Sequence, residues 1–274
     1  MNYFEKLSTI QKKNNSLLCI GLDPDPEKMP SFLKLSPDVI FSFNKAIIDA
    51  THDLVCAYKP NIGFYMAGGV PALKSLKRTI EYIPEDTPVI LDCKVGDVKH
   101  TAESYAKGVL DEFGADAITI TPYIGFESLE PFFAYEDRGI YILVLTSNPG
   151  YLQFQNLEVD NSRLFLKVAS EIRKSEYKNL GMVVGATHPE EAEAVRKAAP
   201  ETPFLIPGIG AQGGDLKRAV QIGTTSDGKP PLMVSGRSII YSSRGRDFAE
   251  AARQKAIETK TFINKSRAVE NNNI

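Results

Sequence analysis

The chain has 274 residues, of which 43% are hydrophobic and 24% are charged, and its formal net charge at pH 7 is −2. This charge argues against a protein that binds duplex nucleic acid, because such a protein needs a basic surface. No apolar run approaches the roughly 20 residues of a membrane-spanning helix, and the first fifteen residues lack the apolar core of a secretory signal. The three cysteines show no close pairing motif, which fits a reducing compartment. We therefore expect a cytoplasmic protein that neither binds nucleic acid nor enters a membrane.

Short apolar runs of strand length alternate with longer amphipathic stretches along the whole chain. The predicted strands, in chain order, are 17–22, 54–58, 88–91, 116–120, 140–145, 180–184, 204–207 and 232–235. The predicted helices between and after them are 37–54, 71–83, 101–112, 127–135, 162–175, 189–199, 215–222 and 247–261. The strand runs lack polar alternation, which is typical of parallel strands that are covered on both faces.

This alternation over about 250 residues predicts an α/β fold, namely a single (β/α)8 TIM barrel. The barrel domain is expected to span 1–274, with a polar C-terminal tail from about 264. A doubly wound open sheet is the alternative. Its nucleotide-binding versions lose support, because no GxGxxG motif follows the first strand and no GxxxxGK[ST] motif occurs.

Polar residues follow the predicted strands, at the end where barrel enzymes carry their active sites. Asp92 and Lys94 are two residues apart after the third strand, so both side chains should point to the same face, and Asp97 follows them. Lys59 ends the second strand and can join them. Alternating charges of this kind keep one another ionised despite burial. A solvated surface salt bridge is the competing interpretation, but the second lysine at the matching strand end argues against it.

The loops after the seventh and eighth strands form a second candidate site. Gly208, Gly210, Gly213 and Gly214 would let backbone N–H groups approach an anion, and the helix predicted from 215 offers its N-terminus. Arg237, at the end of the eighth strand, can bind a phosphate through two hydrogen bonds. These are the loops that usually hold phosphate in this fold.

The pattern of these residues resembles that of the orotidine 5′-phosphate decarboxylase family, in its longer single-domain subgroup. The resemblance rests on Lys59, on the motif Asp92-x-Lys94-x-x-Asp97 and on six segments in order: GLDPDP, YKPNIGFY, LDCKVGDVKHTAESYA, LTSNPG, PGIGAQGGD and VSGRSI. One departure is Val95, where that subgroup is expected to have arginine.

The resemblance implies that Lys94, Asp92, Lys59 and Asp97 are the catalytic residues. Asp92 would face the scissile carboxylate, and Lys94 would stabilise the carbanion and donate a proton to C6 of the pyrimidine. Asp97 would reach into the partner's site of a homodimer with shared active sites. The implied substrate-binding residues are Asp23, Asn61, Thr101, Ser147, Gln212, Gly236 and Arg237.

Among these binding residues, the resemblance places Asp23, Lys59 and Asn61 around the ribose. It assigns Ser147 to the pyrimidine edge, and Gln212 and Arg237 to the phosphate. Thr101 would enter the partner's site together with Asp97.

The implied reaction converts orotidine 5′-monophosphate to uridine 5′-monophosphate, the last step of de novo pyrimidine synthesis, without metal or cofactor. One alternative is a magnesium-dependent sugar-phosphate synthase or lyase of the same barrel superfamily. Such an enzyme is expected to have a glutamate where this chain has Lys59, whose charge would repel a divalent cation. The other alternative is a non-catalytic barrel that keeps only the phosphate-binding Arg237.

Overall fold

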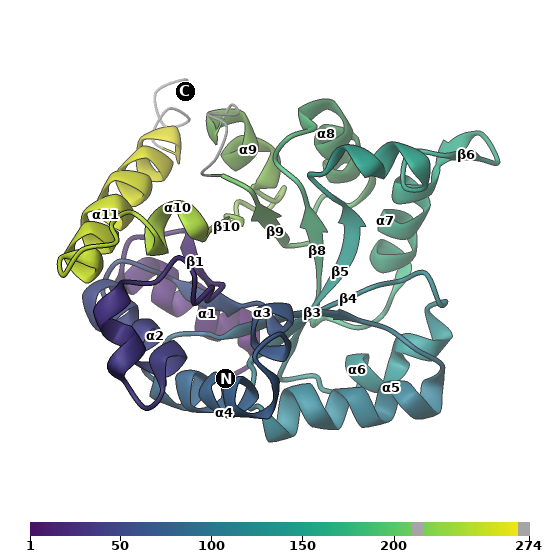
Figure 1. Ribbon diagram of the computed structural model, residues 1–274. Coiled ribbons are helices and arrows are strands. Elements are labelled where there is room, and N and C mark those ends of the chain that lie inside the picture. The colour runs from purple at the N-terminus through teal and green to yellow at the C-terminus, as the bar shows by residue number, and fades with distance from the viewer. Residues whose placement is uncertain (210–215, 268–274) are drawn as a thin grey trace.

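A parallel sheet of eight strands forms the centre of the molecule and curls into a barrel with helices on its outside (Figure 1). The computed structural model describes residues 1–209 and 216–267. The strands are β1 (Leu18–Leu22), β2 (Ala57–Pro60), β3 (Ile90–Val95), β4 (Ala117–Ile120), β5 (Gly139–Leu145), β8 (Leu180–Val184), β9 (Phe204–Pro207) and β10 (Leu232–Ser235). The predicted (β/α)8 barrel is confirmed.

Helices connect consecutive strands and cover the outside of the barrel. The α-helices are α1 (Tyr3–Lys13), α2 (Val39–Thr51), α3 (Ile62–Met66), α4 (Gly69–Tyr82), α5 (Lys99–Ala106), α6 (Glu130–Phe133), α7 (Leu164–Lys174), α8 (Pro189–Ala198), α9 (Leu216–Gly223), α10 (Arg237–Ile240) and α11 (Phe248–Arg267). Shorter helical segments are η1 (Ser31–Leu35), the π-helical η2 (Lys107–Glu112), η3 (Glu127–Leu129) and η4 (Pro149–Gln153).

The strand order β2-β1-β10-β9-β8-β5-β4-β3 leaves β2 and β3 at the two edges of the sheet. Two isolated parallel bridges join these edges, Tyr58 with Val89 and Asn61 with Asp92. The sheet therefore closes on itself. The second bridge also brings the polar ends of β2 and β3 together.

Strand side chains alternate between two apolar regions. On β1, Leu18, Ile20 and Leu22 point outward and pack in the layer between strands and helices. Cys19 points inward, into a smaller cluster inside the barrel. Since both regions are buried, the strands show no polar alternation in the sequence.

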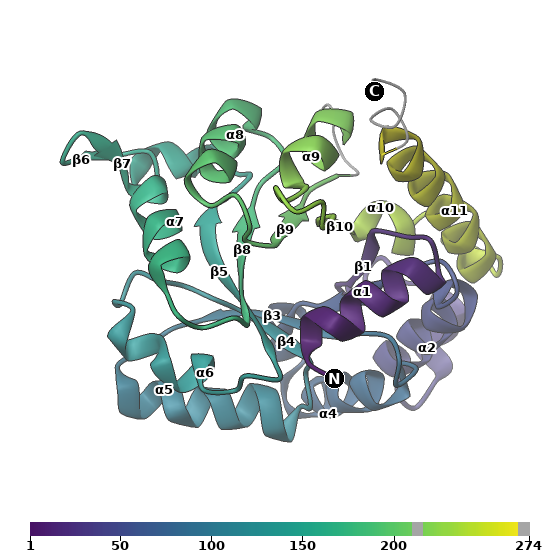
Figure 2. The same cartoon turned by 180° about the vertical axis from the view of Figure 1, so that it is seen from behind.

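Helix α1 closes the end of the barrel where the strands begin (Figure 2). The backbone N–H of Tyr3 donates to Asp137 O just before β5, and Lys6 forms an ion pair with Asp116 just before β4. No helix was predicted here. A capping box between Asn2 and Glu5 marks its start and was a readable signal in the sequence.

Two predicted strands are displaced toward their C-terminal ends. The second strand was predicted at 54–58 but is Ala57–Pro60, because the preceding apolar residues form the buried connection from α2. The third was predicted at 88–91 but is Ile90–Val95. Both strands therefore continue into charged residues that an apolar pattern does not include.

Two helix predictions also need correction. The helix predicted at 162–175 begins only at Leu164, because Ser162–Arg163 pairs with Glu158–Val159 in a hairpin, β6–β7, which projects from the barrel (Figure 1). The helix predicted at 247–261 extends further, since α11 runs to Arg267 and its Ile263 is fully buried. In the described ranges, no helix is long and apolar enough to cross a membrane.

Candidate functional site

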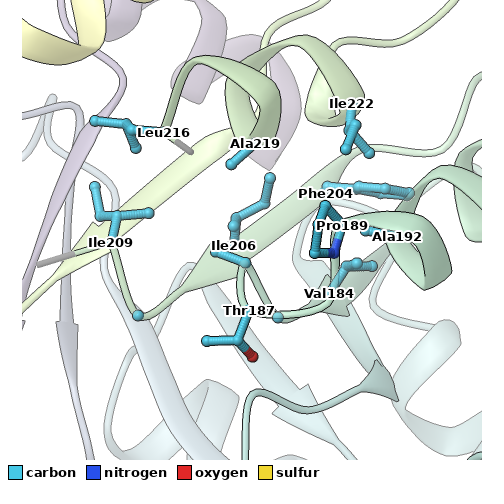
Figure 3. A pocket seen from close by; sticks show the side chains of 13 residues that line it. Val184, Thr187, Pro189, Ala192, Phe204, Ile206, Ile209, Leu216, Ala219 and Ile222 are labelled. Carbon is cyan, nitrogen blue, oxygen red and sulfur yellow. The ribbon is translucent and has the colours of Figure 1, made fainter. Parts of the chain in front are cut away.

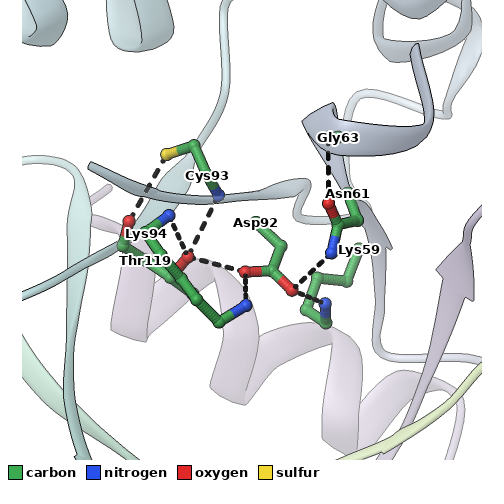
Figure 4. Close-up of polar contacts among 7 residues, drawn as sticks. All are labelled: Lys59, Asn61, Gly63, Asp92, Cys93, Lys94 and Thr119. Atoms are coloured by element: carbon green, nitrogen blue, oxygen red, sulfur yellow. Dashed lines mark hydrogen bonds and ion pairs between the residues drawn. The ribbon is translucent and has the colours of Figure 1, made fainter. Parts of the chain in front are cut away.

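Asp92 is the centre of a hydrogen-bonded cluster at the C-terminal ends of β2, β3 and β4 (Figure 4). Its Oδ1 accepts hydrogen bonds from Lys94 Nζ at 2.5 Å and Thr119 Oγ1 at 2.8 Å. Its Oδ2 accepts from Lys59 Nζ and, at 3.4 Å, from Asn61 Nδ2. Four donors therefore surround one buried carboxylate, and the structure brings together Lys59, Asp92 and Lys94.

The charges in this cluster stabilise one another. Burial alone would raise the pKa of Asp92, but the charges of Lys59 and Lys94 outweigh it and hold the pKa well below its ordinary value. Burial alone would lower the pKa of Lys59, and the charges of Asp92 and Asp23 reverse this, so its pKa is raised. Asp92 is consequently an anion and Lys59 a cation at neutral pH.

The backbone of β3 is irregular at Lys94, so the direction of its side chain does not follow from the simple alternation of a strand. Its backbone has a φ of +44°, in the left-handed region that non-glycine residues rarely adopt. The side chain nevertheless turns back to Asp92 and remains 44% exposed. Its ammonium group is therefore held at one side by Asp92 and is open to a ligand at the other.

Asp23 lies beside the cluster, just after β1. Burial raises the pKa of Asp23, and the nearby positive charge of Lys59 opposes that change. Its Oδ1 is buried and has no hydrogen-bond partner among the described residues. A buried carboxylate oxygen without a donor suits a ligand that supplies a hydroxyl group.

Asp97 and Thr101 lie apart from the Asp92 cluster. Asp97 is partly exposed after β3, and its Oδ1 accepts a hydrogen bond from the backbone N–H of Val98 at 2.8 Å. Thr101 is in the first turn of α5. Within the part of the chain that the structure describes, neither residue makes a hydrogen bond or ion pair with Lys59, Asp92 or Lys94.

Ser147, predicted to contact the pyrimidine, lies close to Gly208 of the predicted phosphate loop. Ser147 follows β5 and is the nearest side chain to Gly208, where an added Cβ would be 3.9 Å from Ser147 Oγ. Gly208 has a φ of +93°, which favours glycine. Gln212, with the predicted glycines Gly210, Gly213 and Gly214, lies outside the described residues.

Gly236 brings the end of β10 close to the end of β1. A Cβ at Gly236 would be 3.4 Å from Gly21 Cα and 3.7 Å from Asp23 Oδ2. The next residue, Arg237, is exposed, and its guanidinium makes no hydrogen bond or ion pair with any described residue. The predicted ribose and phosphate contacts therefore lie side by side.

A separate apolar pocket of about 230 Å³ lies between α8, α9 and the strands β8 and β9 (Figure 3). It is lined by apolar side chains such as Phe204, Ile206 and Leu216. It contains none of the charged residues of the Asp92 cluster. We therefore place the chemistry at the polar strand ends and not in this pocket.

Sequence reasoning missed Thr119. This buried residue points into the barrel from β4 and contacts Asp92 directly. The available signal was a polar side chain in the otherwise apolar run Ala117–Ile120, on the face that alternation directs inward.

Comparisons with known proteins agree with this architecture. Residues 16–254 match the family model described as "Orotidine 5'-phosphate decarboxylase / HUMPS family". The chain is 48% identical to the orotidine 5′-phosphate decarboxylase of Cellvibrio japonicus, over 98% of this chain and 100% of that protein. It is 46% identical to the orotidine 5′-phosphate decarboxylase of Thermomicrobium roseum, over 97% of this chain and 96% of that protein.

A solved structure gives the same result. The Leishmania donovani OMP decarboxylase superposes with a TM-score of 0.82 at 34% identity, covering 97% of this chain and 99% of that one. The similarity in sequence and fold extends over nearly the whole chain. This chain therefore belongs to the orotidine 5′-phosphate decarboxylase / HUMPS family.

Proposed function

We propose that the protein decarboxylates orotidine 5′-monophosphate to uridine 5′-monophosphate, the last step of de novo pyrimidine synthesis, without metal or cofactor. The observation that carries this proposal is the buried array of Lys59, Asp92 and Lys94, with the Lys94 ammonium at the open side. Relatives that are nearly half identical over their full length carry the name of this activity.

The chemistry follows from where the charges lie. Breaking the bond between C6 and the carboxylate leaves an electron pair on C6. The Lys94 ammonium, held 2.5 Å from Asp92, stabilises this carbanion electrostatically. A proton then moves from Lys94 Nζ to C6, and the resulting amine regains a proton from solvent. The anionic Asp92 lies beside the substrate carboxylate and disfavours the ground state relative to the transition state.

The remaining contacts bind parts of the substrate that do not react. Asp23 and Lys59 would contact the ribose hydroxyls, with Asn61 nearby, and Ser147 would read the pyrimidine edge. Arg237, with Gly236 and Gln212, would hold the phosphate. Binding energy from the phosphate can then support catalysis at C6.

A magnesium-dependent sugar-phosphate enzyme is the alternative within the same family description. Lys59 argues against it, because its ammonium group is hydrogen-bonded to Asp92 and would repel a divalent cation bound there. In 1–209 and 216–267, no group of three or more His, Cys, Asp or Glu residues could hold a metal ion. We expect full decarboxylase activity in excess chelator. Activity that disappears with chelator and returns with magnesium would favour the alternative.

The direct test is to follow the absorbance decrease of orotidine 5′-monophosphate with purified protein. Turnover that removes one CO₂ for each uridine 5′-monophosphate formed supports the proposal. Binding of the nucleotide without turnover would instead identify a non-catalytic barrel.

We further propose a homodimer in which Asp97 and Thr101 complete the partner's site. Their separation from the Asp92 cluster supports this arrangement. Large apolar side chains are exposed on the same segment, at Val98 and Tyr105, and on the next loop, at Tyr123, and exposed apolar surface commonly marks an interface. Gly96 allows the two segments to approach closely, since a Cβ there would be 2.7 Å from Thr121 O.

Subunit exchange tests the shared site. Lys94→Ala and Asp97→Asn should each be inactive alone, but random reassortment should restore about a quarter of wild-type activity, because half of the dimers are mixed and half of their sites are intact. Exchange is checked by mass labelling. A mixture that has exchanged and stays inactive would reject the shared site.

The cytoplasmic location and the single-domain organisation remain predictions. All three cysteines are free thiols, which supports a reducing compartment. Fractionation of the native cell with an antibody to the protein would test the location.

A further inference from the structure

The backbone of β3 is irregular where it carries the reactive side chains. Leu91 is paired with Ile118 of β4, and the next pair is Val95 with Ile120. Three residues of β3, from Asp92 to Lys94, therefore face a single residue of β4, Thr119. The bulge interrupts the regular backbone pairing of this segment with β4, so N–H groups within it need other acceptors.

The Thr119 hydroxyl replaces the missing partners. It accepts hydrogen bonds from the backbone N–H of Cys93 at 3.1 Å and of Lys94 at 3.0 Å. It donates its proton to Asp92 Oδ1 at 2.8 Å. A hydroxyl group has one proton and two lone pairs, so all of its hydrogen-bonding capacity is used within this bulge (Figure 4).

These contacts fix both ends of the Asp92–Lys94 ion pair. The hydrogen bond to the Lys94 N–H holds a residue whose φ of +44° is otherwise unfavourable. The hydrogen bond to Asp92 reaches Oδ1, the same oxygen that accepts from Lys94 Nζ at 2.5 Å. Thr119 is 1% exposed and is a neutral group within this cluster.

We propose that Thr119 is a positioning residue for the reaction: through the Lys94 peptide and the Asp92 carboxylate, it aims the Lys94 ammonium at the reacting carbon. This inference rests on the proposed decarboxylase function. Its mechanism is geometric, because a misplacement of about 1 Å at a reacting group can lower the rate on the order of 10²-fold.

The test compares Thr119→Val with Thr119→Ser. Valine keeps the shape of threonine but has no hydroxyl, and serine keeps the hydroxyl but loses the methyl group. We expect Thr119→Val to lower kcat on the order of 10²-fold, while KM and the Kd for uridine 5′-monophosphate change by less than about threefold. Thr119→Ser should stay within about fivefold of the wild-type kcat, because its hydroxyl can make the same three hydrogen bonds.

Thr79→Val is the matched control for loss of a buried threonine hydroxyl. Thr79 is fully buried on α4, where its Oγ1 donates to Ser75 O at 2.7 Å and accepts from Asn44 Nδ2 at 3.1 Å. We expect it to lower the melting temperature and to leave kcat unchanged. If Thr119→Val does not fold, Thr119→Cys replaces it, since a thiol is a weak donor and acceptor.

Several results would overturn the proposal. They are a normal kcat in the folded valine or cysteine variant, an equal loss of kcat in the serine variant, or a parallel loss of uridine 5′-monophosphate binding. Wild-type protein without decarboxylase activity would reject the proposed function itself, and the role of Thr119 with it. If the wild type is active and Thr119→Val is equally active, only the positioning role is rejected.

Discussion

The two ends of the barrel solve the problem of buried polar groups in opposite ways. At the end closed by α1, Tyr3 and Tyr141 meet edge to face, with their hydroxyl oxygens 3.2 Å apart. Burial raises the pKa of Tyr3 well above its ordinary value and that of Cys19 to about 12, so both stay neutral. At the open end, Asp92 and Lys59 are also buried and yet remain charged.

The difference shows what permits charge inside a barrel. Removing a single charge from water is very unfavourable, and a phenol or thiol avoids this by remaining protonated. Asp92 keeps its charge because donors from β2, β3 and β4 reach both of its oxygens. The closed end therefore contributes stability, and the open end holds a preorganised electrostatic site.

The largest expected effect is at the open end, on the rate. Lys94→Ala should lower kcat by at least about 10³-fold, because it removes the charge proposed to stabilise the carbanion and the proposed proton donor to C6. Binding of uridine 5′-monophosphate, measured by calorimetry, should remain. Tyr141→Phe at the closed end is the control and should keep its full kcat. A strong loss of kcat in the control would contradict the separation of roles between the two ends.

Two carboxylates of the open end should change stability in opposite directions. Asp92→Asn should lower the free energy of unfolding by about 3–5 kcal/mol, because the buried charge of Lys59 loses its partner. Asp23→Asn should raise it, because burial raises the pKa of Asp23 and the neutral amide avoids that cost. Urea unfolding at pH 7 measures both changes.

The pH dependence of these two variants gives a second check. The pKa of Asp92 is lowered in the folded state, so its stabilising effect is present above the unfolded pKa of about 3.9 and is lost as the pH falls through the folded value. The pKa of Asp23 is raised, so its cost is full at neutral pH and disappears in acid. Both variants should therefore approach wild-type stability as the pH falls. Effects of the same sign at pH 7 would contradict this account.

At the closed end, a change should affect stability but not chemistry. Tyr3→Ala should lower the free energy of unfolding by about 3 kcal/mol, as expected when a buried aromatic side chain is removed. The ring packs directly against Gly139, where a Cβ would be 2.3 Å from Tyr3 Cδ1. Well below the melting temperature, kcat/KM should match wild type. A large fall in kcat/KM of the folded variant would show that the two ends are coupled.

The smallest expected effect is at Arg237, where a substitution at the open end should change nucleotide binding. Arg237→Ala should weaken binding of uridine 5′-monophosphate by about 2–3 kcal/mol, the scale of a hydrogen bond to a charged group. Calorimetry measures the change. Uridine, which has no phosphate, is the control ligand and should bind both proteins equally. Unchanged affinity for the nucleotide would remove Arg237 from the phosphate site.

Much of the fold could be read from the sequence because the signals are local. The strands 180–184, 204–207 and 232–235 were placed at their observed bounds. They are uninterrupted apolar runs between turn residues, and such runs do not depend on a particular neighbour. Motif order from Asp23 to Arg237 indicated the family for the same reason, since it is a property of the chain and not of its packing.

The sequence by itself therefore determined the alternation of strands and helices, the barrel class and the set of charged residues at the strand ends. Only the tertiary structure decided how these residues meet. The bulge in β3, the positive φ of Lys94 and the contact of Thr119 with Asp92 depend on pairing between β3 and β4. A single-strand pattern carries no information on such pairing, because register is fixed by the neighbouring strand and by the closure of the barrel.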